Sequence, residues 1–220
     1  MKTVKFYYAD TTFDLAVPDD TPVLESEVDK LKSGRPGIDI VREAMENPIG
    51  SPRLSELARD KKDCVIIISD HTRPVPSKDI LPNMVRELRE GNPDIEISFL
   101  VATGFHRGTT PEELRQKLGD DFYEEFKDHI IVHDAHDPST NVKVGVLPSG
   151  PDCIIDKAAI NTSLLLAEGF IEPHFFAGYS GGRKSILPGV ADVVAGLEIP
   201  ANLFSLNGHK KFSFHILLYR

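Results

Sequence analysis

The chain has no tryptophan, and it contains only two cysteines and three methionines among 220 residues. Cys64 and Cys153 stand in the apolar runs DCVIIIS and DCIID without metal-ligand spacing, so we expect packing thiols rather than ligands or a disulfide. No apolar run approaches the ~20 residues of a membrane-spanning helix, and the start MKTVKFYYADTTFDLAV lacks the apolar centre of a secretion signal. We therefore expect a cytoplasmic globular protein with no membrane partner.

Basic residues are scarce as well. The chain has 25 Lys and Arg against 34 Asp and Glu, which gives a net charge of -9 and an isoelectric point near 5.4. Nucleic-acid binding draws most of its affinity from clustered basic side chains, so the charge excludes it as the main function. A small molecule is the expected ligand.

The N-terminal part predicts a hairpin followed by two helices. KTVKFYYA and TFDLAV read as strands joined by a polar turn from Asp10 to Thr12. IDIVREAMENPIG and SPRLSELARDKK then carry apolar residues at helical spacing.

From Cys64 onward, strand and helix patterns alternate. CVIIIS is a β-branched apolar run typical of a strand buried on both faces, and SKDILPNMVRELREGN follows with helical period. IEISFLVA and TTPEELRQKLGDDFYEEF repeat the pair, with Thr110, Pro111 and Glu113 forming a capping box at the helix start. HIIVHD, NVKVGVLPSG, CIID and NTSLLLAEGF are further strands. The fold class is therefore α/β, a mainly parallel, Rossmann-like sheet flanked by helices, with an N-terminal β-hairpin.

Unusual polar residues follow three of these strands. They are Asp70-His71-Thr72-Arg73 after the first, His106-Arg107 between glycines after the second, and Glu172-Pro173-His174 after the third. Because parallel strands end at one edge of a sheet, where ligands bind in such folds, we expect one active site there.

Each residue also has a simpler interpretation. Asp70 can cap turn amides or pair with Arg73, and His71 can face solvent. His106 and His174 can be ordinary loop residues. The run from His133 to Asp137 offers two metal ligands, but a strand end entering a polar turn is the favoured interpretation.

The glycine-rich stretch HFFAGYSGGRKSILPG places Lys184-Ser185 after a turn, as a phosphate-binding P-loop does. A P-loop needs glycine immediately before its lysine, and Arg183 occupies that place. The side chain of Arg183 would crowd the cradle of amides, so a P-loop is disfavoured.

Three motifs, DHTRPVPSK, ATGFHRGTT and EGFIEPHFFAGYSGGRKSILPG, resemble the N-terminal domain of the nickel-dependent lactate racemase family. The resemblance runs from about Lys2 to Val190, and it implies racemisation or epimerisation of a small 2-hydroxy acid. It also implies a nickel pincer nucleotide, a sulfur-bearing pyridinium mononucleotide that accepts hydride from the substrate and depends on dedicated synthesis enzymes.

The resemblance assigns roles to single positions. Lys184 matches the lysine that carries the cofactor, and His106 and His174 match the pair of histidine acid/bases. Asp70, His71, Thr72 and Arg73 match the loop that contacts the cofactor.

The sequence departs from the family pattern after about residue 190. We expect residues 1–190 to form the lactate racemase-like domain and residues 191–220 to be a divergent tail, with the family's second domain absent. His209 is the nearby residue that could serve as nickel ligand, and it lies farther from Lys184 than the pattern asks. A non-catalytic module that binds a mononucleotide or another anion is therefore the alternative function. An enzyme using diffusible NAD is disfavoured because no GxGxxG follows a strand.

Overall fold

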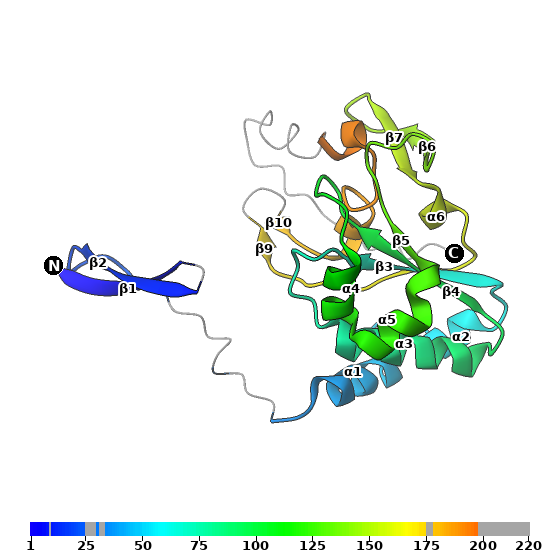
Figure 1. The fold of residues 1–220 in the computed structure, drawn as a ribbon, viewed down its shortest axis with the longest axis horizontal. Coiled ribbons are helices and arrows are strands. Elements are labelled where there is room, and N and C mark those ends of the chain that lie inside the picture. The colour runs from blue at the N-terminus through cyan, green and yellow to red at the C-terminus, as the bar shows by residue number, and fades with distance from the viewer. Residues whose placement is uncertain (9, 25–29, 31–33, 175–177, 198–220) are drawn as a thin grey trace. The chain divides into compact units, whose positions relative to one another are not determined.

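The computed structural model describes residues 1–8, 10–24, 30, 34–174 and 178–197 (Figure 1). The chain forms two compact units, one ending at Arg35 and the other beginning at Pro36. Across the described residues, no helix has the length and apolar character needed to cross a bilayer.

The first unit contains the expected hairpin. Strand β1 (Lys2–Tyr8) pairs antiparallel with β2 (Thr11–Val17), with Lys2 opposite Val17 and Tyr8 opposite Thr11. The rings of Phe6 and Phe13 stack across the two strands with their centroids 6.0 Å apart. Such aromatic cross-strand pairs stabilise a two-stranded ribbon and fix its register.

The second unit is built on a four-stranded parallel sheet in the order β5-β4-β3-β8. Its strands are β3 (Asp63–Ser69), β4 (Glu96–Ala102), β5 (Ile130–Val132) and β8 (Leu165–Ala167). The central strand β3 pairs in parallel with both β4 and β8. The expected parallel sheet is therefore confirmed.

Side chains along β3 point alternately to the two faces of the sheet, and both faces are buried. Cys64, Ile66 and Ile68 join one apolar cluster, which also includes side chains of four helices. These are α2 (Leu54–Ala58), α3 (Ser77–Gly91), α4 (Pro111–Leu118) and α5 (Asp120–Phe126). Helix α1 (Gly37–Glu46) packs on α3.

The opposite face of the sheet is covered by chain that follows β5. Val65 and Ile67 pack in a second cluster with Ile155, Ala159 and Val190. The elements here are β6 (Asn141–Val146), β7 (Asp152–Asp156) and the short helix α6 (Lys157–Ile160). Strands β6 and β7 form an antiparallel pair of their own, outside the parallel sheet.

The helical stretch after β4 differs from expectation at one residue. Instead of one helix through residues 110–126, the chain forms α4 and α5, separated by Gly119 with φ of 87°. A positive φ favours glycine and interrupts the helix, a break that apolar periodicity alone does not reveal. A short 3-10 turn, η2 (Lys127–His129), completes the connection to β5.

The start of α4 carries the capping box that the sequence predicts. The Glu113 amide donates to Thr110 Oγ1 at 3.3 Å, and the Thr110 amide donates to Glu113 Oε2 at 2.9 Å. Replacing the hydroxyl leaves an unpaired amide in the first turn.

We expect Thr110→Ala to lower the free energy of unfolding by about 1 kcal/mol, the usual contribution of an N-cap. Urea unfolding measures it, with Thr110→Ser as control because serine keeps the capping hydroxyl. Equal stability of the alanine variant and the native chain would contradict this account of α4.

Candidate functional site

A cleft opens at the carboxyl edge of the parallel sheet. The chain leaves β3 toward β4 on one side, and β8 later joins the other side of β3, so the direction of winding changes there. Ligands bind at such switch points in open α/β sheets. The cleft has a volume of about 260 Å³, and its lining includes Asp70, Arg73, His106, Glu168, His174 and Lys184.

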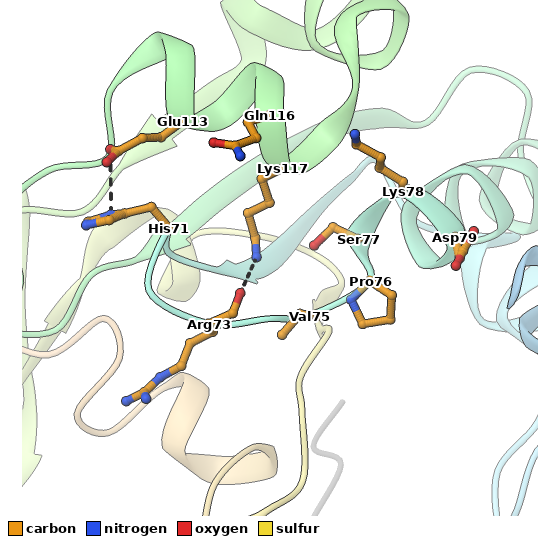
Figure 2. Close-up of a pocket in the computed structure, with 10 residues that line it drawn as sticks. All are labelled: His71, Arg73, Val75, Pro76, Ser77, Lys78, Asp79, Glu113, Gln116 and Lys117. Atoms are coloured by element: carbon orange, nitrogen blue, oxygen red, sulfur yellow. Dashed lines mark hydrogen bonds and ion pairs between the residues drawn. The ribbon is translucent and has the colours of Figure 1, made fainter. Parts of the chain in front are cut away.

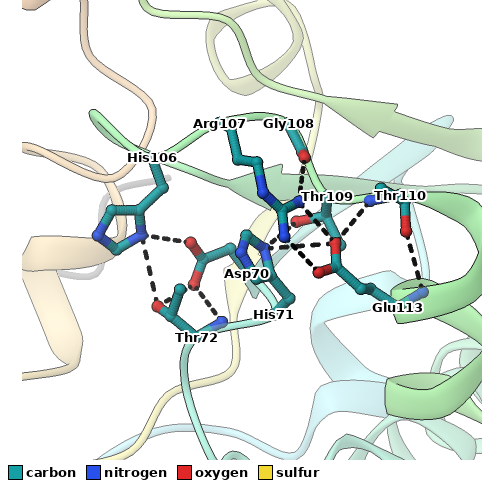
Figure 3. Close-up of polar contacts among 9 residues, drawn as sticks. All are labelled: Asp70, His71, Thr72, His106, Arg107, Gly108, Thr109, Thr110 and Glu113. Carbon is teal, nitrogen blue, oxygen red and sulfur yellow. Dashed lines mark hydrogen bonds and ion pairs between the residues drawn. The ribbon is translucent and has the colours of Figure 1, made fainter.

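Asp70 and His106 form a close polar contact in this cleft. Asp70 follows β3 and is 1% exposed, and its Oδ2 lies 2.5 Å from His106 Nδ1 (Figure 3). A carboxylate can only accept a hydrogen bond, so Nδ1 carries the proton. Whenever the ring of His106 is neutral, this contact places its lone pair on Nε2, as in other Asp–His pairs that prepare a base.

Asp70 also shapes its own loop. Its Oδ1 accepts from the Thr72 amide at 3.1 Å and from Thr72 Oγ1 at 2.7 Å. This is the turn-capping interpretation of Asp70, and it coexists with the contact to His106. Arg73 makes no ion pair with Asp70 within the described chain, so its guanidinium remains available to the cleft.

His71 turns away from His106. Its Nδ1 lies 3.2 Å from Thr109 Oγ1 and 3.8 Å from Glu113 Oε2. His71 lines a neighbouring cleft of about 530 Å³ between the start of α3 and α4, where Lys117 Nζ donates to the Arg73 carbonyl (Figure 2). Arg73 lines both clefts, whereas His71 lines only this neighbouring one.

Glu113 anchors the loop that carries His106. Its carboxylate accepts from both terminal nitrogens of Arg107, at 2.9 and 2.6 Å, and from the Thr110 amide. Arg107 first, and the Thr110 amide next, lower the pKa of Glu113 to about 2. Glu113 is therefore ionised at neutral pH and holds the loop between His106 and α4.

Two short strands, on either side of residues 175–177, pair with each other beside the cleft. Strand β9 (Pro173–His174) pairs antiparallel with β10 (Gly178–Tyr179), and the Ser180 amide donates to the Glu172 carbonyl at 3.0 Å. This short ribbon positions His174 at the cleft.

Lys184 lies on a 3-10 turn, η3 (Gly182–Ser185), entered through Gly181 and Gly182 with φ of 76° and 55°. A Cβ on Gly181 would approach the Phe170 carbonyl oxygen to 3.2 Å, so glycine allows both the backbone turn and the close approach. A P-loop opens a long α-helix, and η3 has only four residues. The disfavoured P-loop interpretation of this stretch therefore has no support here.

The glycine-rich loop is also tied to the loop of His106. The Gly104 amide donates to the Gly189 carbonyl at 2.9 Å. A Cβ on Gly189 would lie 2.4 Å from the Ser185 carbonyl oxygen, so a larger residue would displace the turn that carries Lys184. The two loops thus form one wall of the cleft.

Burial and neighbouring positive charges lower the affinity of Lys184 and His174 for protons. Burial lowers the pKa of Lys184, Arg73 lowers it further, and Glu172 opposes them. Burial likewise lowers the pKa of His174, followed by the charges of Lys184 and Arg73, again opposed by Glu172. Both shifts favour the neutral, proton-accepting form of these side chains.

The histidine run after β5 is structural. His133 is 2% exposed, and its Nδ1 and Nε2 contact Asp156 Oδ2 at 2.8 Å and the Ala191 carbonyl at 3.0 Å. Both ring nitrogens are thus engaged within the protein, which agrees with the strand-end interpretation. No group of three potential metal ligands converges among the described residues, and His209 lies outside them.

Two residues of this region were not identified from the sequence. Glu168 follows β8 directly and lines the cleft, and Lys117 of α4 donates to the Arg73 carbonyl. The signal for Glu168 was a charged residue at the carboxyl end of the apolar run LLLA. Lys117 lies among the polar residues of a predicted helix, and the sequence does not reveal that it contacts the Arg73 carbonyl.

Comparison with known proteins identifies the family of the chain. The sequence profile of the lactate racemase N-terminal domain matches residues 8–197. The lactate racemase of Thermoanaerobacterium thermosaccharolyticum is 47% identical over 195 residues, which cover 88% of this chain. That of Lactiplantibacillus plantarum is 57% identical over 151 residues, or 69% of this chain. The chain spans 45% and 35% of the lengths of these two relatives.

Solved structures give the same relationship. The lactate racemase apoprotein from Thermoanaerobacterium thermosaccharolyticum superimposes with a TM-score of 0.80 at 45% identity, covering 89% of this chain and 45% of that one. A protein from Thermotoga maritima, at 22% identity and a TM-score of 0.56, covers 76% of this chain and 47% of that one, and shares the fold. The chain belongs to the lactate racemase N-terminal domain family.

Proposed function

We propose that this chain is the cofactor-holding part of a racemase or epimerase that acts on a small, lactate-like 2-hydroxy acid. The observation that carries the proposal is the convergence of His106, His174 and Lys184 on one cleft at the switch point of the sheet. Two proton-accepting rings and a nucleophilic amine in one cleft suit a reaction that needs both acid/base groups and an attached cofactor.

The residues of the cleft fit a nickel pincer nucleotide. Arg73 and Lys184 supply positive charge for an anionic mononucleotide, and Gly181 lets the backbone turn closely beside the ligand. When bound, this cofactor supplies the chemistry that takes the hydrogen from Cα of the 2-hydroxy acid and returns it to the opposite face. His209 as a further nickel ligand stays a prediction.

Lys184 is the attachment point in this proposal. Its lowered pKa leaves a larger share of the amine neutral at a given pH than an ordinary lysine has. The neutral amine is the nucleophile, so the surroundings of Lys184 favour formation of a covalent bond.

His106 is one of two proposed acid/base groups. With Nδ1 directed at Asp70, Nε2 can accept the proton of the substrate hydroxyl and later give it back.

His174 is the second proposed acid/base group. The two enantiomers of a 2-hydroxy acid present their hydroxyls differently, so each requires a base of its own. The lowered pKa keeps His174 neutral near neutral pH and ready to accept a proton. Burial and the charges of Lys184 and Arg73 disfavour the protonated ring.

Intact mass spectrometry tests the attachment. After co-expression with the enzymes that make the cofactor, we expect a sulfur-containing adduct on the native chain and none on Lys184→Ala. Arg183→Ala is the matched control, because its exposed neighbouring side chain does not line the cleft. An unmodified native chain would contradict the cofactor assignment.

Racemisation of D- and L-lactate tests the two histidines. We expect His106→Ala and His174→Ala each to slow conversion by about 10²–10⁴-fold, the usual contribution of a general acid or base, with the adduct retained. His129→Ala is the control, since His129 is exposed on η2 and outside the cleft. An adduct on the native chain without conversion of either enantiomer would instead favour a binding module.

An NMR titration tests the electrostatic account of His174. We expect a pKa below the ordinary value of about 6.5 in the unmodified chain. Lys184→Met should raise this pKa because it removes a cation that opposes protonation, and Glu172→Gln should lower it by removing an anion. Arg183→Met should leave it unchanged; a pKa insensitive to Lys184→Met would refute the coupling.

A further inference from the structure

Glu168 presents an unusual buried carboxyl at the floor of the cleft. It follows β8 directly and is 5% exposed. Its Oε1 accepts from Ser77 Oγ at 2.6 Å, whereas its Oε2 is buried without a hydrogen-bond partner in the part of the chain that the structure describes.

A second buried oxygen stands on the adjacent strand. Ser69 is the last residue of β3, which pairs with β8, and its Oγ also has no hydrogen-bond partner among the described residues. Ser69 and Glu168 line the same cleft as Arg73, His106 and Lys184. Both residues therefore border the space where a ligand is expected, and each keeps one buried, unpaired oxygen.

The contact with Ser77 does not account for this arrangement. Ser77 is 1% exposed and begins α3, so its hydroxyl ties that helix to the end of β8 through one carboxyl oxygen. A purely structural contact with Ser77 requires only Oε1, so it leaves the burial of Oε2 unexplained. Buried polar atoms are nearly always hydrogen-bonded, and the exceptions in a native fold call for an explanation such as a ligand.

Charge limits the kind of group that Glu168 can bind. Arg73 and Lys184 suit the anionic parts of a ligand, whereas the Glu168 carboxyl accepts hydrogen bonds and repels anions. Burial raises the pKa of Glu168, and the Ser77 hydroxyl, the charge of Lys117 and the Ser69 backbone amide oppose that shift. As an acceptor, Oε2 suits a neutral donor group such as a hydroxyl.

We propose that Glu168 Oε2 and Ser69 Oγ bind a hydroxyl group of the ligand and so select hydroxyl-bearing ligands in this cleft. The identity of the ligand rests on the proposed function, which offers two sources of the hydroxyl. One is the sugar of a pyridinium mononucleotide, and the other is the 2-hydroxy acid itself.

Two matched pairs of probes separate these sources. Nicotinic acid riboside and 1-methylnicotinic acid differ by the sugar, and lactate and propionate differ by the hydroxyl. NMR titration of the unmodified chain gives each dissociation constant. We expect about tenfold tighter binding of the hydroxyl-bearing member of one pair, the scale of one hydrogen bond to a charged group.

Variants then identify which side chains cause the preference for the hydroxyl-bearing probe. Glu168→Met and Ser77→Ala both remove the bond between these two residues, but only Glu168→Met removes the Oε2 acceptor. We expect Glu168→Met to abolish the preference and Ser77→Ala to retain it. Ser69→Ala should reduce the preference without lowering the midpoint of thermal unfolding, because its hydroxyl has no partner to lose among the described residues.

Glu168→Gln keeps the inference testable if the methionine variant does not fold. It preserves the shape and an acceptor for Ser77, and it should lose most of the preference. Equal effects of Glu168→Met and Ser77→Ala, or no preference by the native chain in either pair, would overturn the inference. The adduct on Lys184 is measured separately, so failure of the proposed function can be distinguished from failure of this inference.

Discussion

The parallel pairing of β3 with both β4 and β8 is the constraint on which the candidate site depends. It brings the residues after three separate strands to one edge, so that Asp70, His106 and Glu168 line one cleft. The alternating side chains of β3 are buried in clusters on both faces, which holds the strand in register. A one-residue slip would move those side chains to the opposite faces and separate the polar ends.

The residues of this cleft give the two proposed acid/base histidines different neighbours. The carboxyl of Asp70 contacts His106 Nδ1, whereas burial first, and then the charges of Lys184 and Arg73, lower the pKa of His174. The two histidines that we propose as acid/base groups therefore have different neighbours, a carboxyl beside His106 and two cationic side chains near His174. Such a difference suits a reaction that must run in both directions, with either histidine taking or giving a proton.

Much of the fold and part of the site could be predicted from the sequence, because local patterns carry them. The hairpin, the parallel sheet and the Thr110 capping box depend on alternation, apolar runs and spacing. The break at Gly119 depends on one backbone angle, and the turn of His71 toward Glu113 depends on tertiary contacts. Glu168 was missed for the same reason, since an unpaired buried oxygen is a property of the folded chain.

The central claim is that one cleft holds a cofactor on Lys184 between two histidines. A crystal structure of the chain after co-expression with the cofactor-making enzymes tests it most directly. The account predicts electron density continuous with Lys184 Nζ, filling the cleft within reach of His106 and His174. Density bound elsewhere, with a free Lys184 side chain, would contradict it.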